Sequence, residues 1–147
     1  MTTIVHDDDA DLADIEGARV AVVGYGNQGR SWALNLRDSG LDVSVCVRAD
    51  ASRDQALADG FEARELADAG GADIVCVLVP DDVIPSLPLR RPNDGLTIVA
   101  SGYTLAFDRF DPPGDVAMLP RGCSGPRYAS ATRRASGSSP PSVCIGT

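Results

Sequence analysis

The chain has 147 residues, of which 44% are hydrophobic, and this is enough for one domain with a buried core. Its formal charge is −8, which argues against nonspecific binding to nucleic acid. No apolar run is long enough to cross a bilayer, and no signal peptide begins the sequence. We therefore expect a cytoplasmic protein that has neither a nucleic-acid partner nor a membrane partner.

Strand-like and helical patterns alternate along residues 17–121. This segment follows an acidic leader over residues 1–16, which we expect to be disordered, and precedes a low-complexity tail over residues 122–147. Strands that alternate with helices predict an α/β fold, a Rossmann-type doubly wound parallel sheet in a single domain.

Apolar periodicity and helix-stop signals give the bounds of the expected elements. The expected strands are residues 19–23, 41–47, 72–79, 96–100 and 116–119. The expected helices are residues 27–38, residues 52–59 and a short helix opened by Pro80, Asp81 and Asp82. Cys46 and Cys76 lie inside strand-like runs, so we expect them to be small buried side chains rather than metal ligands.

A glycine-rich turn follows the first expected strand. It has the pattern G-x-G-x-x-G and consists of Gly24, Tyr25, Gly26, Asn27, Gln28 and Gly29. The first glycine allows the tight turn, the second lets a pyrophosphate approach the backbone, and the third lets the helix lie close to the strand. The unpaired amides and the dipole of the following helix favour an anion. The turn therefore indicates a dinucleotide site in preference to a purely structural turn.

The end of the second expected strand bears on the choice of cofactor. An acidic residue about 20 positions beyond the glycines binds the ribose of NAD, whereas this sequence has Arg48, 19 residues after Gly29. A guanidinium can pair with a 2′-phosphate, and Ser52 can add a hydroxyl, so NADP(H) is favoured over NAD(H). Asp50 would repel that phosphate, and a simple Arg48–Asp50 ion pair in solvent is the alternative.

Beyond the glycine-rich turn, the motifs resemble those of the ketol-acid reductoisomerase family. The resemblance covers about residues 15–121 and is carried by GYGNQG, by ALNLRDSG and by the Asp59-Gly60-Phe61 triplet. It implies branched-chain amino acid biosynthesis, in which Mg²⁺-assisted alkyl migration in an acetohydroxy acid precedes reduction by NADPH. It also implies that Asp81 and Asp82 flank the nicotinamide.

The remaining cofactor positions follow from the fold and the same resemblance. Tyr25, Asn27 and Gln28 match the family's phosphate-binding turn. Pro80 and Gly102 lie in loops at the carboxyl ends of expected strands, where such sheets bind ligands.

Two departures affect the family's catalytic residues. The family's His-Gly-Phe-Asn motif reads Ser101-Gly102-Tyr103-Thr104 here, so a serine stands at the position of a catalytic histidine. Serine does not titrate near neutral pH as imidazole does. The family's Pro-Lys pair reads Pro120-Arg121, and arginine does not carry protons. The family's Mg²⁺ ligands lie in a helical second domain, so we assign no metal ligand in this sequence.

Three interpretations of the function stay open. The chain is a truncated NADP-linked reductoisomerase that is inactive alone, a stand-alone nucleotide-binding module, or a relative that reduces a different substrate. Residues 122–147 favour truncation, because GC-rich codons for this tail, read two nucleotides later, can encode the family's continuation. We therefore hypothesise a frameshift near Arg121. An uncovered edge of the sheet would also favour a homo-oligomer.

Overall fold

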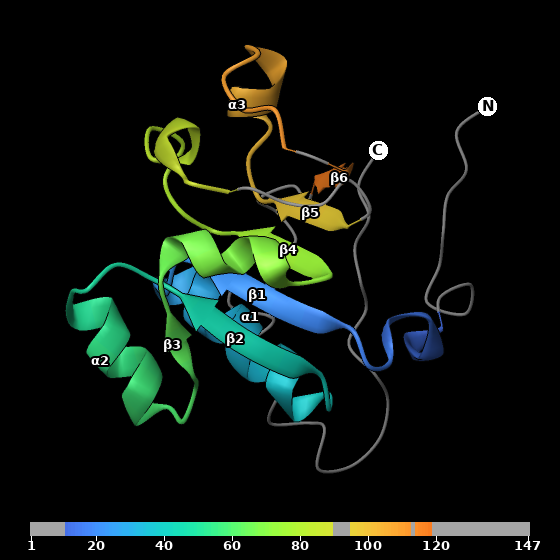
Figure 1. Cartoon of the computed structure of the whole chain (residues 1–147), viewed down its shortest axis with the longest axis vertical. Coiled ribbons are helices and arrows are strands. Elements are labelled where there is room, and N and C mark those ends of the chain that lie inside the picture. Colours follow the sequence, from blue (N-terminus) through green and yellow to red (C-terminus); the bar gives the residue numbers. More distant parts are fainter. Residues whose placement is uncertain (1–10, 90–94, 113, 119–147) are drawn as a thin grey trace.

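Short apolar segments form the strands of one parallel sheet, which we describe from a computed structural model of residues 11–89, 95–112 and 114–118. The sheet has six strands in the order β3-β2-β1-β4-β5-β6 (Figure 1). The strands are β1 (Arg19–Val23), β2 (Asp42–Cys46), β3 (Ala63–Arg64), β4 (Ile74–Val77), β5 (Leu96–Val99) and β6 (Asp115–Met118). From β1 the chain adds β2 and β3 on one side and then returns to add β4, β5 and β6 on the other. Such folds bind their ligands at this switch point between β1 and β4.

The central strand β1 separates two apolar cores, because alternate side chains of a strand point to opposite faces. Val20 and Val22 belong to the core on one face. Ala21 and Val23 belong to the core on the other. All four side chains are buried, as expected for a parallel strand covered on both faces.

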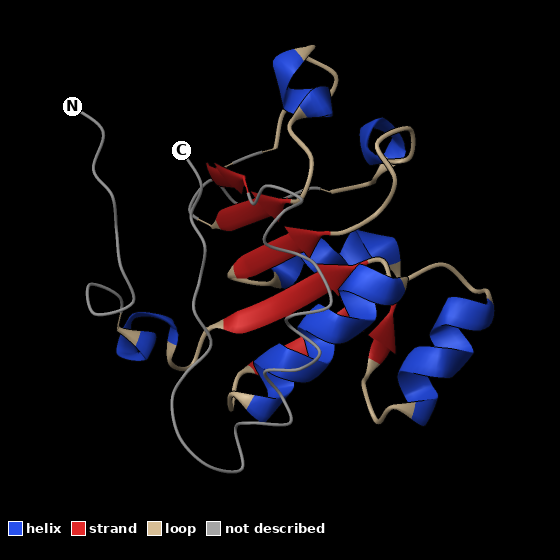
Figure 2. Ribbon diagram, turned by 180° about the vertical axis from the view of Figure 1, so that it is seen from behind, coloured by secondary structure: helices blue, strands red, loops and turns tan. Residues whose placement is uncertain are grey.

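Helices cover both faces of the sheet. The described helices are α1 (Asn27–Asp38), α2 (Ala51–Ala58), α3 (Tyr103–Ala106) and the 3-10 helices Leu12–Ile15, Leu66–Gly71 and Ile84–Ser86. Figure 2 shows α1 lying over one face of the sheet, alongside the strands, with α2 beside the β3 edge. None of the described helices combines the length and the apolar character that crossing a membrane requires.

The structure confirms the predicted fold class and the bounds of β1 and α1. The predicted strands 41–47, 72–79 and 96–100 are one to four residues longer than the observed ones. The predicted strand 116–119 and the predicted helix 52–59 are each displaced by one residue. The prediction that Pro80, Asp81 and Asp82 open a helix is wrong in detail. A turn covers residues 81–83, and a 3-10 helix begins only at Ile84, since Pro85 sits at its start.

Two further predictions concern the acidic leader and the two cysteines in the strands. The leader that we expected to be disordered contains the 3-10 helix Leu12–Ile15, capped by Asp11, while residues 1–10 lie outside the described part. Cys46 and Cys76 are buried, as predicted. Burial raises the pKa of Cys46 to about 11 and that of Cys76 to about 12, so both thiols stay protonated at neutral pH.

Candidate functional site

The turn after β1 can be built only with glycine at its first and last positions. Gly24 has a φ of 95°, and an added Cβ would lie 2.7 Å from Cγ1 of Val79 and 2.8 Å from the carbonyl oxygen of Leu78. A Cβ at Gly29 would overlap the carbonyl oxygen of Gly24. Both glycines therefore serve close packing between the turn, α1 and the end of β4.

Gly26 has different surroundings, because an added Cβ there would meet no atom within 4 Å. It is also the N-cap of α1 and provides no side chain to cap the helix. The first backbone amides of α1, those of Asn27 and Gln28 among them, have no acceptor within the helix. Open space and unsatisfied donors at a helix N-terminus together form a cradle suited to a pyrophosphate.

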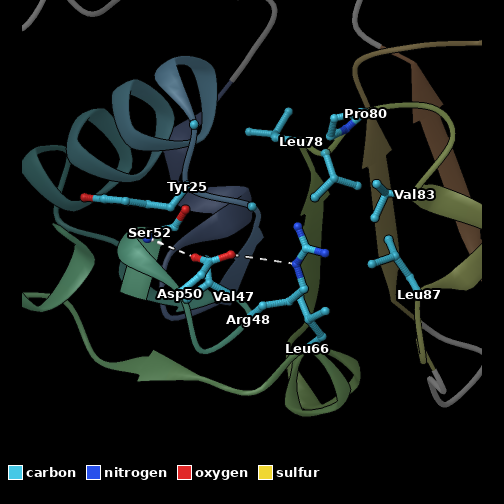
Figure 3. A pocket seen from close by; sticks show the side chains of 13 residues that line it. Tyr25, Val47, Arg48, Asp50, Ser52, Leu66, Leu78, Pro80, Val83 and Leu87 are labelled. Atoms are coloured by element: carbon cyan, nitrogen blue, oxygen red, sulfur yellow. Dashed lines mark hydrogen bonds and ion pairs between the residues drawn. The ribbon is translucent and has the colours of Figure 1, made fainter. Parts of the chain in front are cut away.

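A pocket of about 210 Å³ lies next to this cradle (Figure 3). Segments from β1, β2 and β4 contribute to it at the carboxyl edge of the sheet. Its lining residues are Gly24, Tyr25, Gly26, Val47, Arg48, Asp50, Ser52, Leu66, Leu78, Val79, Pro80, Val83 and Leu87.

One wall of the pocket is polar and comes from the segment between β2 and α2. Asp50 caps α2, with its Oδ1 accepting a hydrogen bond from the amide of Ser52 at 2.9 Å. Its Oδ2 lies 3.8 Å from Nε of Arg48, whose side chain is 72% exposed. An ion pair this long and this exposed contributes little to stability, so the guanidinium can turn to another anion at small cost.

The opposite wall is apolar. Figure 3 shows Leu78, Pro80, Val83 and Leu87 facing Arg48 and Asp50 across the pocket. A pocket with a charged wall and an apolar wall suits a phosphorylated ribose joined to a flat ring.

The structure places the predicted cofactor residues in three groups. Those that line the pocket are Gly24, Tyr25, Gly26, Arg48, Asp50, Ser52 and Pro80. Those in the first turn of α1 are Asn27, Gln28 and Gly29, and the side-chain Nε2 of Gln28 is buried with no hydrogen-bond partner in the described structure. Asp81 and Asp82 lie in the turn after Pro80, outside the pocket lining.

The predicted residues after β5 do not line this pocket. Gly102 caps α3, and a Cβ there would approach the sulfur of Met118 at 2.5 Å. The Oγ of Ser101 accepts a long hydrogen bond of 3.4 Å from the amide of Tyr103. The hydroxyl of Thr104 is fully buried with no partner in the described structure. Arg121 lies outside the described residues.

Sequence reasoning missed the ionic cluster beside the turn. The carboxylate of Asp59 accepts hydrogen bonds from the Tyr25 hydroxyl at 2.9 Å and from Arg30 at 2.6 and 3.0 Å. The hydrogen bonds from Arg30 are the largest cause that holds the pKa of Asp59 well below its usual range. Burial and the neighbouring carboxylate raise the pKa of Tyr25. The Asp59-Gly60-Phe61 triplet was visible as a motif, but its contact with Tyr25 was not.

A dinucleotide fits this site, and the described part of the chain offers no comparable site for a metal ion. The space over Gly26 and the uncapped start of α1 accept a pyrophosphate. Within residues 11–89, 95–112 and 114–118, no three His, Cys, Asp or Glu side chains are grouped to hold a metal ion. We therefore assign no Mg²⁺ ligand among these residues.

A parallel sheet of this order, with a ligand pocket at its glycine-rich turn, defines a dinucleotide-binding domain of the Rossmann class. The family described as acetohydroxy acid isomeroreductase, NADPH-binding domain, matches residues 14–126. The chain belongs to this family. The resemblance inferred from the sequence motifs is thereby confirmed.

Relatives with known names agree with this assignment. A ketol-acid reductoisomerase (NADP(+)) from Caldivirga maquilingensis is 45% identical over 123 residues, which cover 79% of this chain and 37% of that protein. The solved structure of an NADH-preferring ketol-acid reductoisomerase from an uncultured archean matches with a TM-score of 0.72 and 30% identity, over 81% of this chain and 40% of that one. The chain thus spans about two fifths of the length of these relatives.

One more distant structure shows the fold alone. An imine reductase from Myxococcus stipitatus, in complex with NAD+, matches with a TM-score of 0.58 and 21% identity over 71% of this chain and 40% of that one.

Proposed function

We propose that this chain binds NADP(H) at the glycine-rich turn and provides the cofactor-binding part of a ketol-acid reductoisomerase. The observation that carries the proposal is the open space over Gly26 beside an uncapped helix N-terminus, at the edge of a two-walled pocket. The family membership and the two reductoisomerase relatives support it.

Each part of the site has a proposed task. The amides at the start of α1 hold the pyrophosphate, and Gly26 allows its approach. Arg48 and Ser52 hold the phosphorylated ribose. The apolar wall with Pro80 and Val83, which faces Arg48, receives the adenine ring that this ribose carries. When bound, the reduced cofactor supplies a hydride.

The preference for NADP(H) over NAD(H) is the finer part of the proposal. Arg48 supports NADP(H), because its exposed guanidinium is held, within the described residues, by a single long ion pair. Asp50 opposes it, because its carboxylate lies in the same wall and would meet the 2′-phosphate. One named relative is described with NADP(+) and the other as NADH-preferring, so binding of both cofactors needs to be measured.

Calorimetric titration of the purified chain with NADPH and with NADH tests the cofactor proposal. We expect saturable binding of one dinucleotide per chain, tighter for NADPH. No heat of binding with either cofactor at millimolar concentration would contradict the proposal.

We further propose that this chain alone does not convert 2-acetolactate. Ser101 cannot exchange a proton near neutral pH as the histidine expected at its position would. Consumption of NADPH by the chain with 2-acetolactate and Mg²⁺ would contradict this. Ser101 also supports the second candidate function, reduction of a different substrate, and a screen of small 2-keto acids with NADPH addresses it.

A truncation by frameshift near Arg121 remains our hypothesis for the tail, which lies outside the described residues. The genomic DNA beyond codon 121 tests it directly. We expect the shifted frame to encode a continuation of the family, and a shifted frame rich in stop codons would remove the hypothesis.

A further inference from the structure

The carboxylate of Asp59 connects the glycine-rich turn to the far end of α2. Asp59 is the C-cap of α2, and its Oδ2 accepts hydrogen bonds from the Tyr25 hydroxyl and from Nε of Arg30. Its Oδ1 accepts from a terminal nitrogen of Arg30 at 3.0 Å. Tyr25 belongs to the turn and Arg30 to the first turn of α1, so one side chain holds both segments.

The acceptor of this cluster and its tyrosine donor are sheltered from water. The side chain of Asp59 is 14% exposed and Tyr25 is 6% exposed, whereas the side chain of Arg30 is 48% exposed. A two-point hydrogen bond between guanidinium and carboxylate fixes both distance and orientation. Three hydrogen bonds on one largely buried carboxylate therefore constrain the geometry of the turn.

A second layer of contacts holds the same junction. Arg37 of α1 donates a hydrogen bond to the carbonyl oxygen of Asp59 at 2.8 Å, and its guanidinium lies over the ring of Phe61 at 5.0 Å. The rings of Phe61 and Tyr25 meet edge to face, with 5.9 Å between their centroids. The end of α2 is thus docked on α1 beside the glycine-rich turn.

The opposite end of α2 carries the polar wall of the pocket. Asp50 caps the start of this eight-residue helix, and Ser52 lies in its first turn. An eight-residue α-helix is a rigid element, so we expect a shift of its C-terminal end to displace its N-terminal end. The polar wall is the ribose wall of the proposed site, because Arg48 and Ser52 are proposed to hold the ribose. The distance between the pyrophosphate cradle at Gly26 and this ribose wall then depends on the contact at Asp59.

We infer that Asp59, acting through Tyr25 and Arg30, is a positioning residue that holds the ribose wall of the pocket at the spacing an adenosine 2′-phosphate and a pyrophosphate require. The inference rests on the proposed function. Without the contact, the cradle and the ribose wall have the binding geometry for a smaller fraction of the time. The apparent dissociation constant rises by the inverse of that fraction.

Two variants and a matched control test the inference. Tyr25→Phe removes one hydroxyl and leaves the Arg30 contact, and Asp59→Asn weakens both. Asp73→Asn is the control. Asp73 also accepts a two-point hydrogen bond from an arginine, Arg19, at 3.2 and 3.1 Å, but this pair lies at the start of β1 and does not line the pocket.

The ligands are NADPH and 2′-phospho-ADP-ribose, which lacks the nicotinamide. We expect Asp59→Asn to raise the dissociation constants of both ligands by the same factor, about tenfold. Tyr25→Phe should raise the dissociation constants less. A double variant that combines Tyr25→Phe with Asp59→Asn should bind no worse than Asp59→Asn alone, because the hydroxyl acts through the carboxylate. Asp73→Asn should bind as the wild type does.

Calorimetry well below each variant's unfolding temperature separates positioning from stability. If Tyr25→Phe and every folded Asp59 variant bind both ligands with wild-type affinity and only their unfolding temperatures fall, the inference is overturned and the cluster is purely structural. A loss for NADPH with none for 2′-phospho-ADP-ribose also overturns it. If the wild type binds neither ligand, the proposed function fails, and the inference fails with it.

Discussion

Gly26 and Gly29 lie in the same turn, but an added methyl group meets different surroundings at the two positions. At Gly26 the space is open toward the pocket, and the φ of −75° suits any L-residue. At Gly29 the space is filled by the carbonyl of Gly24. The first glycine thus serves the ligand and the second serves the fold.

This difference predicts opposite outcomes for two alanine substitutions. Gly26→Ala should leave the unfolding temperature nearly unchanged and weaken NADPH, because the methyl group occupies the ligand's side of the turn. Gly29→Ala should destabilise the fold by about 2 kcal/mol or more, as overpacking does. Thermal unfolding and calorimetric titration of both variants check this. A Gly26→Ala variant with wild-type affinity would move the pyrophosphate elsewhere.

Arg48 and Asp50 act in opposite directions on a 2′-phosphate. Arg48→Gln should lower the affinity for NADPH by about tenfold, because a charge-assisted contact is lost, and should change the affinity for NADH little. Asp50→Asn should raise the affinity for NADPH by about threefold, since asparagine still caps α2 and no longer repels the phosphate. The ratio of the two affinities in each variant is the measurement. Equal changes for NADPH and NADH would place the 2′-phosphate away from this pair.

The junction of α1 and α2 also makes the stability of these elements depend on pH. The hydrogen bonds from Arg30 hold the pKa of Asp59 below its ordinary value in the folded state. The stabilisation is therefore complete above the unfolded pKa of about 4 and is lost as the pH falls toward the folded pKa. Denaturant unfolding from pH 6 to pH 2 should show a shallower decline for Asp59→Asn than for the wild type. Parallel curves would show that Asp59 contributes nothing to acid sensitivity.

The elements differ in how much of them the sequence could predict. Arg19–Val23 and Asn27–Asp38 were predicted to the residue, because an apolar run, a glycine-rich turn and a Ser-Gly stop mark their ends. The strand Ala63–Arg64 has two residues and a polar side chain, so it carries no apolar period and exists only through pairing with β2. The 3-10 helix Leu66–Gly71 is rich in glycine and alanine and likewise carries no apolar period that would predict it.

The same contrast holds for the candidate site. Local patterns predicted Gly26, Arg48 and Ser52, since each stands at a known distance from a strand end. The contact between Tyr25 and Asp59 joins residues 34 positions apart and depends on how α2 docks on α1. No local pattern encodes such a contact, although the presence of both motifs was visible.

At the scale of the whole molecule, the β6 side of the described sheet exposes apolar side chains. Within the described residues β6 is an outer strand, and its Val116 and Met118 are 42% and 51% exposed. An apolar outer strand favours association with another chain. We predict a dimer or larger species in size-exclusion chromatography with light scattering, and Val116→Lys should shift it toward the monomer. A monodisperse wild-type monomer at high concentration would contradict this.

The proposed function requires that a dinucleotide bind at the glycine-rich turn. Nuclear magnetic resonance of the isotope-labelled chain, titrated with NADPH, tests this residue by residue. We predict that the largest amide shifts fall on Gly24, Gly26 and Asn27, with smaller ones at Arg48 and Ser52. Shifts confined to other segments, or none at saturating NADPH, would contradict the account.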